Sequence, residues 1–237
     1  MAFIWTESKI KFFTDASEYT GFHAEIAESI KPHLNSDWSM CDMGCGLGYI
    51  DFQLAPCVKA IDAIDNSELA IDDYYKRLAA SNIKNINLEL TNTDGLSGRE
   101  WDAILLSFYG RPGEALDHIF SMAKKSVIML AYVEALPEGQ GKLKKNTGRP
   151  TTSDMENYLI ENNYDYEVII KSIDFGQPFE RIDDVTKYYE SYTREEDPGK
   201  RTQQIEEVLA SVKPLNDSKF SYYLPKKKDI GVFVVNK

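Results

Sequence analysis

Three glycines stand at alternate positions in the segment MCDMGCGLGYIDF, which covers residues 40–52. They are Gly44, Gly46 and Gly48, and Asp42 precedes the first of them by two residues. Glycine has no Cβ, so a loop of this kind lets a ligand come very close to the backbone. A carboxylate at Asp42 could hold N–H donors of the loop or the ammonium group of a ligand. The segment therefore predicts a loop that binds a small molecule.

The residues around these glycines disfavour two phosphate-binding loops. A P-loop requires Gly-Lys followed by Ser or Thr, and no lysine or arginine lies between Lys31 and Lys59. A dinucleotide-binding loop has the form G-x-G-x-x-G. Here Tyr49 stands where that pattern needs its third glycine, because Gly48 comes one residue early. Both absences favour a ligand that is bound without a phosphate.

A second acidic residue follows the next apolar segment, residues 57–65, which we predict to be a strand. A carboxylate at the carboxyl end of such a strand can accept hydrogen bonds from both hydroxyls of a ribose. Asp62 and Asp65 are the two candidates. Asp62 falls in mid-strand, whereas Asp65 directly precedes Asn66 and Ser67, the turn into a helix. We therefore assign ribose binding to Asp65.

The segment CDMGCGLG has the form D-x-G-x-G-x-G and resembles motif I of the class I S-adenosylmethionine-dependent methyltransferases. The resemblance is clear over residues 19–133 and looser toward the C-terminus. It implies S-adenosylmethionine as the cofactor and S-adenosylhomocysteine as the product. The residues that it implies for cofactor binding are Asp42, Gly44, Cys45, Gly46, Gly48, Asp65, Asn66, Asp94, Gly95 and Ser107.

The resemblance also implies what the later segments contact. In NTDGL, residues 92–96, Asp94 would accept the adenine amino group and the N–H of Gly95 would bind a ring nitrogen. Asn66 would lie against the adenine, and Ser107 in LLSFYG would flank the methionine part of the cofactor. LLSFYG lacks the Asn-Pro-Pro-Tyr or Asp-Pro-Pro-Tyr of enzymes that methylate adenine N6 or glutamine N5. This departure disfavours those two acceptors.

Methyl transfer from a sulfonium is an in-line displacement with a neutral leaving group. The enzyme mainly aligns the reacting atoms and excludes water, and it needs a general base only if the acceptor must lose a proton. The sequence therefore need not contain a recognisable catalytic residue, and we assign none. His23 and Tyr109 are the two candidates.

The predicted elements place these residues at one edge of a sheet. We expect helices over 19–33, 49–55, 68–81, 113–125 and 152–163, and strands over 38–43, 57–65, 86–90, 101–108, 126–133, 166–173 and 229–237. Strands that alternate with helices predict an α/β fold, a Rossmann-like doubly wound, mostly parallel sheet of seven strands with helices on both faces. Ligands of such sheets bind beyond the carboxyl ends of the strands.

We expect one domain over residues 1–237. Its core would comprise about 19–173 together with 229–237. Residues 174–228 contain two helix-like stretches, 181–192 and 200–212, and are too long for a simple connection. We interpret this segment as a helical lid inserted before the last strand.

The composition of the chain disfavours several classes of binding partner. The net charge of −11, from 27 basic and 38 acidic residues, disfavours nucleic acid. No apolar run approaches the roughly 20 residues that cross a bilayer, and the N-terminal residues lack a signal-peptide layout. The three cysteines fit no zinc pattern and no disulfide framework. We expect a cytoplasmic monomer or homodimer without a metal.

The leading hypothesis is a methyltransferase for a small-molecule acceptor. The first alternative is a protein that binds S-adenosylmethionine without catalysis, as a regulatory or partner subunit. An NAD-dependent oxidoreductase is the less favoured alternative, because only the glycine loop supports it.

Overall fold

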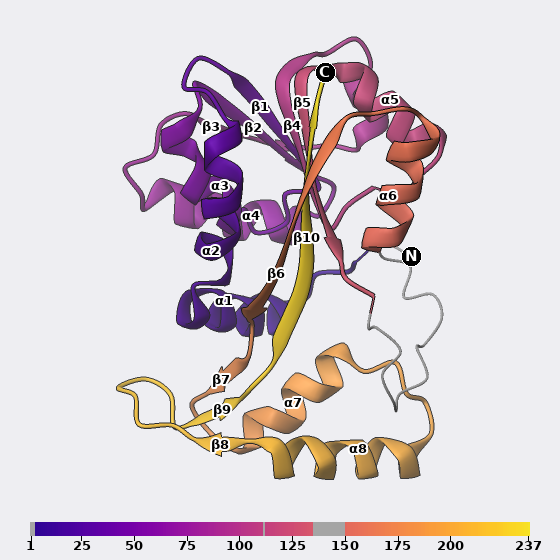
Figure 1. Cartoon of the computed structure of the whole chain (residues 1–237). Helices are drawn as coiled ribbons and strands as arrows, with labels where there is room; N and C mark the ends of the chain where they lie inside the picture. The colour runs from indigo at the N-terminus through magenta and orange to yellow at the C-terminus, as the bar shows by residue number, and fades with distance from the viewer. Residues whose placement is uncertain (1–2, 111, 135–149) are drawn as a thin grey trace. The chain divides into compact units, whose positions relative to one another are not determined.

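The computed structural model describes residues 3–110, 112–134 and 150–237 (Figure 1). Its main feature is a seven-stranded sheet with the strand order β3-β2-β1-β4-β5-β10-β6. The strands are β1 (Ser39–Met43), β2 (Ala60–Asp65), β3 (Ile86–Leu90), β4 (Trp101–Ser107), β5 (Ala123–Tyr132), β6 (Tyr166–Asp174) and β10 (Lys227–Asn236). The pairs β3–β2, β2–β1, β1–β4 and β4–β5 are parallel, and β10 runs antiparallel to β5. The predicted doubly wound, mostly parallel sheet is confirmed.

Helices cover both faces of this sheet. They are α2 (Phe22–Ile30), α3 (Tyr49–Leu54), α4 (Glu68–Ala79), α5 (Glu114–Met122) and α6 (Thr152–Glu161), with short 3-10 turns η1 (Lys31–His33), η2 (Ala55–Cys57) and η3 (Thr93–Leu96). In Figure 1, α2, α3 and α4 lie on one side of the sheet, and α5 and α6 lie on the other. Side-chain caps fix where two of these helices begin. The side chain of Ser67 caps the first turn of α4, and Thr151 forms a capping box with Asp154 at the start of α6.

The core of the sheet explains why its central strands read as nearly continuous apolar runs. β1 lies between β2 and β4, and its residue Asp42 pairs with Ala63 on one side and Leu105 on the other. A strand with neighbours on both edges and helices on both faces leaves no face for water. Buried residues of the central strands include Met40, Cys41, Ile61, Ile64, Ile104, Leu105, Ile128 and Met129.

The chain divides into two compact units. One comprises residues 23–172 and 229–237, and the other comprises residues 4–22 and 173–228. The second unit contains α1 (Glu7–Thr20), β7 (Gln177–Phe179), α7 (Asp183–Tyr192), α8 (Pro198–Ser211), β8 (Lys213–Pro214) and β9 (Tyr222–Leu224). Residues 174–228, which we interpret as a lid, lie in this unit, and their function as a lid stays a prediction.

The second unit has a small aromatic core of its own. The rings of Phe12, Phe179 and Tyr188 meet edge to face, with centroid distances of 5.4 to 6.2 Å. Phe12 comes from α1 and Phe179 from β7, so the unit joins residues that are far apart in the sequence. Buried aromatic side chains provide much of the stability of so small a unit.

The structure differs from the predicted elements at two helix boundaries and in one additional small sheet. The helix expected over 19–33 begins at Phe22, because Gly21 has a φ of 66° and ends a separate helix, α1, that was not predicted. The helix expected over 113–125 ends at Met122, and Lys124 and Lys125 belong to the exposed start of β5. The three-stranded sheet β7-β9-β8 was missed because its strands of two or three residues are too short to show a pattern.

Candidate functional site

The glycine loop joins β1 to α3 and has a backbone that needs glycine. Gly44, Gly46 and Gly48 have φ angles of 76°, 55° and 69°, in the left-handed region. The N–H groups of Gly44 and Cys45 donate to the carbonyl oxygen of Ile64, at 2.8 and 3.0 Å. The loop is therefore fixed to the end of β2, next to the residue assigned to ribose binding.

Asp65 holds this loop directly. Its carboxylate accepts the N–H of Gly46 at 2.8 Å through one oxygen and the N–H of Ser67 at 2.8 Å through the other. A carboxylate has about four lone-pair positions, so two acceptors remain for a ligand. Asp65 thus links the glycine loop to the start of α4 and can still accept two hydroxyl groups.

Asp62, the candidate that was set aside, is occupied inside the protein. Its carboxylate accepts the indole N–H of Trp101 at 2.7 Å, and the amide of Asn87 donates to it at 3.1 Å. The guanidinium of Arg99 lies 3.4 Å away. These contacts give Asp62 a structural role between β2, β3 and β4.

Two of the three glycines make room for aromatic rings of the chain itself. A methyl group built on Gly44 would come within 2.5 Å of Cδ2 of Tyr109, and one built on Gly48 would overlap the ring of Tyr74. The sequence interpretation considered only a ligand as the reason for the glycines. Close packing of Tyr109 and Tyr74 is a second reason, which a motif cannot show.

The loop after β4 closes over the glycine loop. Tyr109 lies against Gly44, and its hydroxyl is 3.2 Å from Oγ1 of Thr93 in η3. The preceding residue, Phe108, has a φ of 56°, which is uncommon for a residue with a side chain. Its ring stacks on Tyr132 at the end of β5, with centroids 4.4 Å apart. The loop therefore connects the ends of four strands.

The loops after β2 and β3 also meet. The side-chain amide of Asn66 donates to the side-chain oxygen of Asn92 at 3.0 Å, and the N–H of Gly95 donates to the carbonyl of Asn92 at 3.0 Å. Asp94 lies in η3, but its side chain is outside the part that the structure describes. Ser107 ends β4, opposite Leu130 of β5.

Two buried carboxyl groups lie beneath the loop. Asp42 and Asp51 are 1% and 0% exposed, and the hydroxyl of Tyr74 donates to Oδ2 of Asp51 at 3.0 Å. Burial raises the pKa of Asp51 to about 7 and raises the pKa of Asp42 well above its ordinary value. Asp51 was missed because an acidic residue in the first turn of a helix is ordinary.

The fold of this chain is similar to that of solved structures, although its sequence matches no known family. No family model matches the sequence, and a search of the curated proteins finds no match. Among solved structures, the YcgJ protein of Bacillus subtilis gives a TM-score of 0.58 at 10% identity, over 92% of this chain and 98% of that one. A SAM-dependent methyltransferase of Aquifex aeolicus gives 0.55 at 16% identity, over 72% of this chain and 94% of that one.

A third structure, magnesium protoporphyrin IX methyltransferase of Synechocystis with bound SAM, gives a TM-score of 0.50 at 11% identity, over 100% of this chain and 87% of that one. The similar structures are nearly all S-adenosylmethionine-dependent methyltransferases. This chain has the class I methyltransferase fold.

Within the methyltransferase fold, α4 contributes a cation that the sequence interpretation missed. The guanidinium of Arg77 donates to the carbonyl of Leu47 and lies 4.3 Å from the ring centroid of Tyr49. Its Nε also pairs with Asp73 at 3.1 Å. Arg77 therefore ties α4 to the glycine loop, a contact across 30 residues of chain that no local pattern predicts.

The two catalytic candidates come from different elements, since His23 precedes the glycine loop in the sequence and Tyr109 follows it. His23, on α2, is buried, and its ring stacks on Tyr49 at the start of α3 with centroids 5.3 Å apart. Tyr109 lies against Gly44 after β4. Cys45, whose pKa is raised by burial, directs its thiol toward the carbonyl of Gly46 at 3.8 Å.

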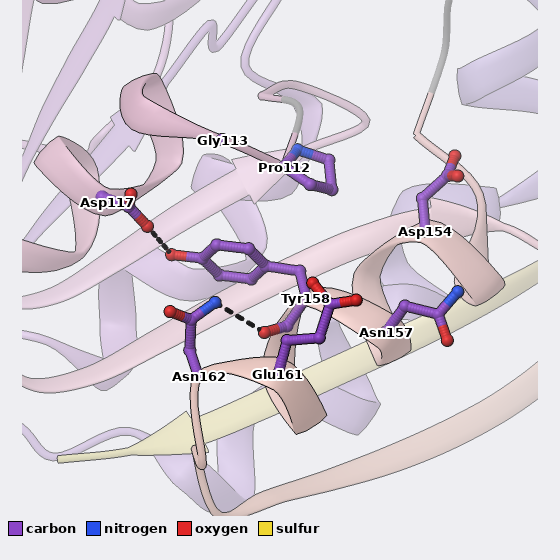
Figure 2. Close-up of a pocket in the computed structure, with 8 residues that line it drawn as sticks. All are labelled: Pro112, Gly113, Asp117, Asp154, Asn157, Tyr158, Glu161 and Asn162. Atoms are coloured by element: carbon purple, nitrogen blue, oxygen red, sulfur yellow. Dashed lines mark hydrogen bonds between the residues drawn. The ribbon is translucent and has the colours of Figure 1, made fainter.

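A separate polar pocket of about 410 Å³ lies between the start of α5 and α6 (Figure 2). It contains none of the site residues named above. The hydroxyl of Tyr158 donates to Asp117 at 2.6 Å across it, and the amide of Asn162 donates to the carbonyl of Tyr158 at 2.9 Å. The lining residues are Pro112, Gly113, Asp117, Asp154, Asn157, Tyr158, Glu161 and Asn162.

Two features are absent from the described residues. Among the helices of residues 3–110, 112–134 and 150–237, none has the length and apolar character to span a bilayer. In the same residues, no group of three or more His, Cys, Asp or Glu side chains is arranged to hold a metal ion.

Proposed function

We propose that this protein is an S-adenosylmethionine-dependent methyltransferase that transfers a methyl group to a small-molecule acceptor. The observation that carries the proposal is the position of Asp65. It ends β2, accepts the N–H of Gly46 in the glycine loop, and keeps two acceptor positions for ribose hydroxyls. The methyltransferase fold supports the same assignment.

The residues present fit this cofactor at its amino acid end. Oδ1 of Asp42 is buried and has no hydrogen-bond partner among the described residues, so it is an acceptor suited to an ammonium group. At the nucleoside end, Asn66, Asp94 and Gly95 would contact the adenine. The part of the cofactor between its amino acid end and its nucleoside end would contact Gly44, Cys45, Gly46, Gly48 and Ser107.

The cofactor, when bound, supplies a methyl group on a sulfonium that leaves as a neutral thioether. The chain's contribution is to bind, orient and exclude water. Tyr109 lies against Gly44 and reaches Thr93, so its loop can cover the glycine loop from the β4 side. His23 and Tyr109 stay the candidates for a general base, which is needed only for an acceptor that must lose a proton.

The choice of a small acceptor rests on charge and on the loop after β4. A net charge of −11 repels nucleic acid backbones, and SFYG replaces the segment of adenine-N6 and glutamine-N5 methyltransferases. Three further parts of the proposal are predictions from the sequence. We propose that the protein is cytoplasmic, that it is a monomer or a homodimer, and that residues 174–228 form a lid.

Titration with S-adenosylhomocysteine by calorimetry tests the cofactor assignment. We expect binding by the intact chain, and a loss of about 1.5–3 kcal/mol of binding free energy in Asp65→Asn, because the charge-assisted hydrogen bonds are lost. Asp62→Asn is the matched control and should leave the affinity unchanged. No binding at high micromolar ligand would exclude the proposal, and equal losses in both variants would contradict the assignment of Asp65.

A turnover experiment separates catalysis from binding alone. Labelled S-adenosylmethionine is incubated with the protein and with fractionated small molecules from a cell extract. Transfer of the label to an acceptor is expected, whereas binding without transfer to any fraction would favour a regulatory or partner protein.

A further inference from the structure

Two aromatic side chains stack at the carboxyl ends of neighbouring strands. Phe108 directly follows β4 and Tyr132 ends β5, and their ring centroids are 4.4 Å apart with an interplanar angle of 25°. Both side chains are half-buried. We call this pair the aromatic stack. It lies at the edge of the sheet where α/β folds bind their ligands.

The backbone of Phe108 has a conformation that is unfavourable for phenylalanine. Its φ of 56° is in the left-handed region, which glycine and asparagine tolerate much better. The N–H of Phe108 donates to the carbonyl of Leu130 in β5 at 3.1 Å, so the sheet holds this conformation. Residues held in such conformations concentrate at functional sites. The turn itself does not explain a phenylalanine, because glycine would form it more easily.

Packing in the core does not explain the Phe108 ring either. The next residue, Tyr109, packs against the buried cluster around β4, β5 and α5, whereas Phe108 is not part of that cluster of described residues. Part of the Phe108 side chain stays exposed to water, so it gains less from burial than a core residue such as Phe120. An unfavourable backbone with a half-buried ring favours a role in binding.

Tyr132 gives the aromatic stack a fixed base. The N–H of Tyr132 donates to the carbonyl of Pro150 at 3.2 Å, and Tyr132 forms a parallel bridge with Thr151. Tyr132 also pairs with Ile230 of β10. Because two other segments hold its backbone, the ring is preorganised for a partner. Aromatic rings attract other rings in offset-stacked or edge-to-face arrangements, so a preorganised stack favours a planar aromatic partner.

The strand order places the aromatic stack beside the proposed cofactor site. In the order β3-β2-β1-β4-β5, the residues assigned to the nucleoside follow β2 and β3, and the glycine loop follows β1. The aromatic stack lies at the ends of β4 and β5, beyond the glycine loop. Ser107, which would flank the methionine part of the cofactor, directly precedes Phe108. An acceptor at the aromatic stack would therefore be next to the end of the cofactor that carries the methyl group.

We propose that the aromatic stack of Phe108 and Tyr132 is the acceptor subsite, and that the acceptor is a planar aromatic molecule that stacks on it. Phe108 is then a specificity-determining residue. The inference rests on the proposed function, which supplies the methyl donor. The net charge of −11 favours a neutral or cationic ring over an anionic one.

Two probes of matched shape test the preference for a planar ring. β-Naphthol is planar, whereas its decahydro derivative has the same carbon skeleton and hydroxyl group but no aromatic ring. Ligand-observed NMR titrations are carried out on the intact chain in the presence of S-adenosylhomocysteine. We expect β-naphthol to bind about tenfold more tightly than the decahydro compound, because only the planar ring can stack. Equal affinities, or no binding of β-naphthol, would overturn the inference.

Two variants of Phe108 separate recognition from stability. Asparagine tolerates the left-handed φ, so Phe108→Asn removes the ring while retaining the turn. We expect β-naphthol to bind about tenfold more weakly, with a melting temperature that is unchanged or higher. Phe108→Leu keeps an apolar side chain without a ring and should weaken β-naphthol binding in the same direction.

The control for these variants is Tyr75→Leu, which removes an exposed ring on α4. It should change neither the affinity for β-naphthol nor the melting temperature. A lower melting temperature of Phe108→Asn together with unchanged affinity for β-naphthol would show that the ring is structural, and would overturn the inference. Unchanged affinity in Phe108→Leu would have the same consequence.

Separate measurements distinguish failure of this inference from failure of the proposed function. Binding of S-adenosylhomocysteine without a preference for β-naphthol would overturn the acceptor subsite and leave the proposed function standing. Binding of β-naphthol that depends on Phe108, without any binding of S-adenosylhomocysteine, would contradict the proposed function and with it the acceptor role. In the turnover experiment, the labelled product should be an aromatic compound, and transfer to an aliphatic acceptor alone would overturn the inference.

Discussion

At the scale of single residues, the glycines of the loop have two separate tasks. Their positive φ angles shape the turn from β1 into α3, and two of them leave space for rings of the protein. The motif D-x-G-x-G-x-G predicts the turn, and the ligand follows only from the family resemblance that the motif carries. The ring contacts of Tyr109 with Gly44 and of Tyr74 with Gly48 depend on side chains 65 and 26 positions away along the chain, so no local pattern contains them.

Replacing Gly48 with Ala separates these tasks. We expect Gly48→Ala to lower the free energy of unfolding by about 2–4 kcal/mol, because it adds a left-handed alanine and a clash with the buried ring of Tyr74. Gly98→Ala is the control, since Gly98 has a φ of 81° but no atom near its missing Cβ, and it should cost about 1–2 kcal/mol. Urea denaturation of both variants measures the difference. Equal costs would show that the Tyr74 ring adapts freely.

At the scale of elements, the strands of the sheet could be predicted from the sequence, whereas the contacts between a helix and the loops of the sheet could not. Strands β4 and β5 were predicted from nearly continuous apolar runs, because strands buried on both faces have few polar residues. The position of Asp65 at the end of β2 followed from the turn residues after it. The link from Arg77 on α4 to the carbonyl of Leu47 did not, since a charged residue on an amphipathic helix normally indicates only an exposed face.

Removal of Arg77 tests this link. We expect Arg77→Met to lower the free energy of unfolding by about 1–3 kcal/mol, from the lost charge-assisted hydrogen bond and the lost contact with the ring of Tyr49. It should also speed amide hydrogen exchange in the glycine loop. Lys76→Met removes a charge from the exposed side of the same helix and should change neither quantity. Unaltered loop exchange in Arg77→Met would contradict a role in holding the loop.

At the scale of the whole molecule, the chain contains two units with separate cores. All residues assigned to the cofactor belong to the unit of residues 23–172 and 229–237. The other unit is held by aromatic contacts of Phe12, Phe179 and Tyr188. If the second unit serves the acceptor, as the predicted lid would, then cofactor affinity should not depend on its stability.

Phe179→Ala tests this independence. Loss of a buried phenylalanine should destabilise the second unit by about 3–5 kcal/mol, seen as faster amide exchange in α1 and α7. The affinity for S-adenosylhomocysteine should stay within about twofold of the intact chain, a change below about 0.4 kcal/mol. Ile182→Ala, an exposed position in the same unit, should alter neither measurement. A large loss of affinity in Phe179→Ala would show that cofactor binding needs the second unit.

The sequence by itself determined the α/β class, the strand pattern and the resemblance from which the cofactor follows. These properties depend on residues that are close together in the sequence, namely the apolar periodicity, the turn residues and the glycine motif. Only the tertiary structure decided which side chains share the space beneath the loop. Asp42 and Asp51 are nine residues apart, yet the raised pKa of each depends on the fold that buries both, and only the fold brings Tyr74 to Asp51. Burial and long-range contact set the chemistry of a carboxyl group, and neither is a property of its neighbours in sequence.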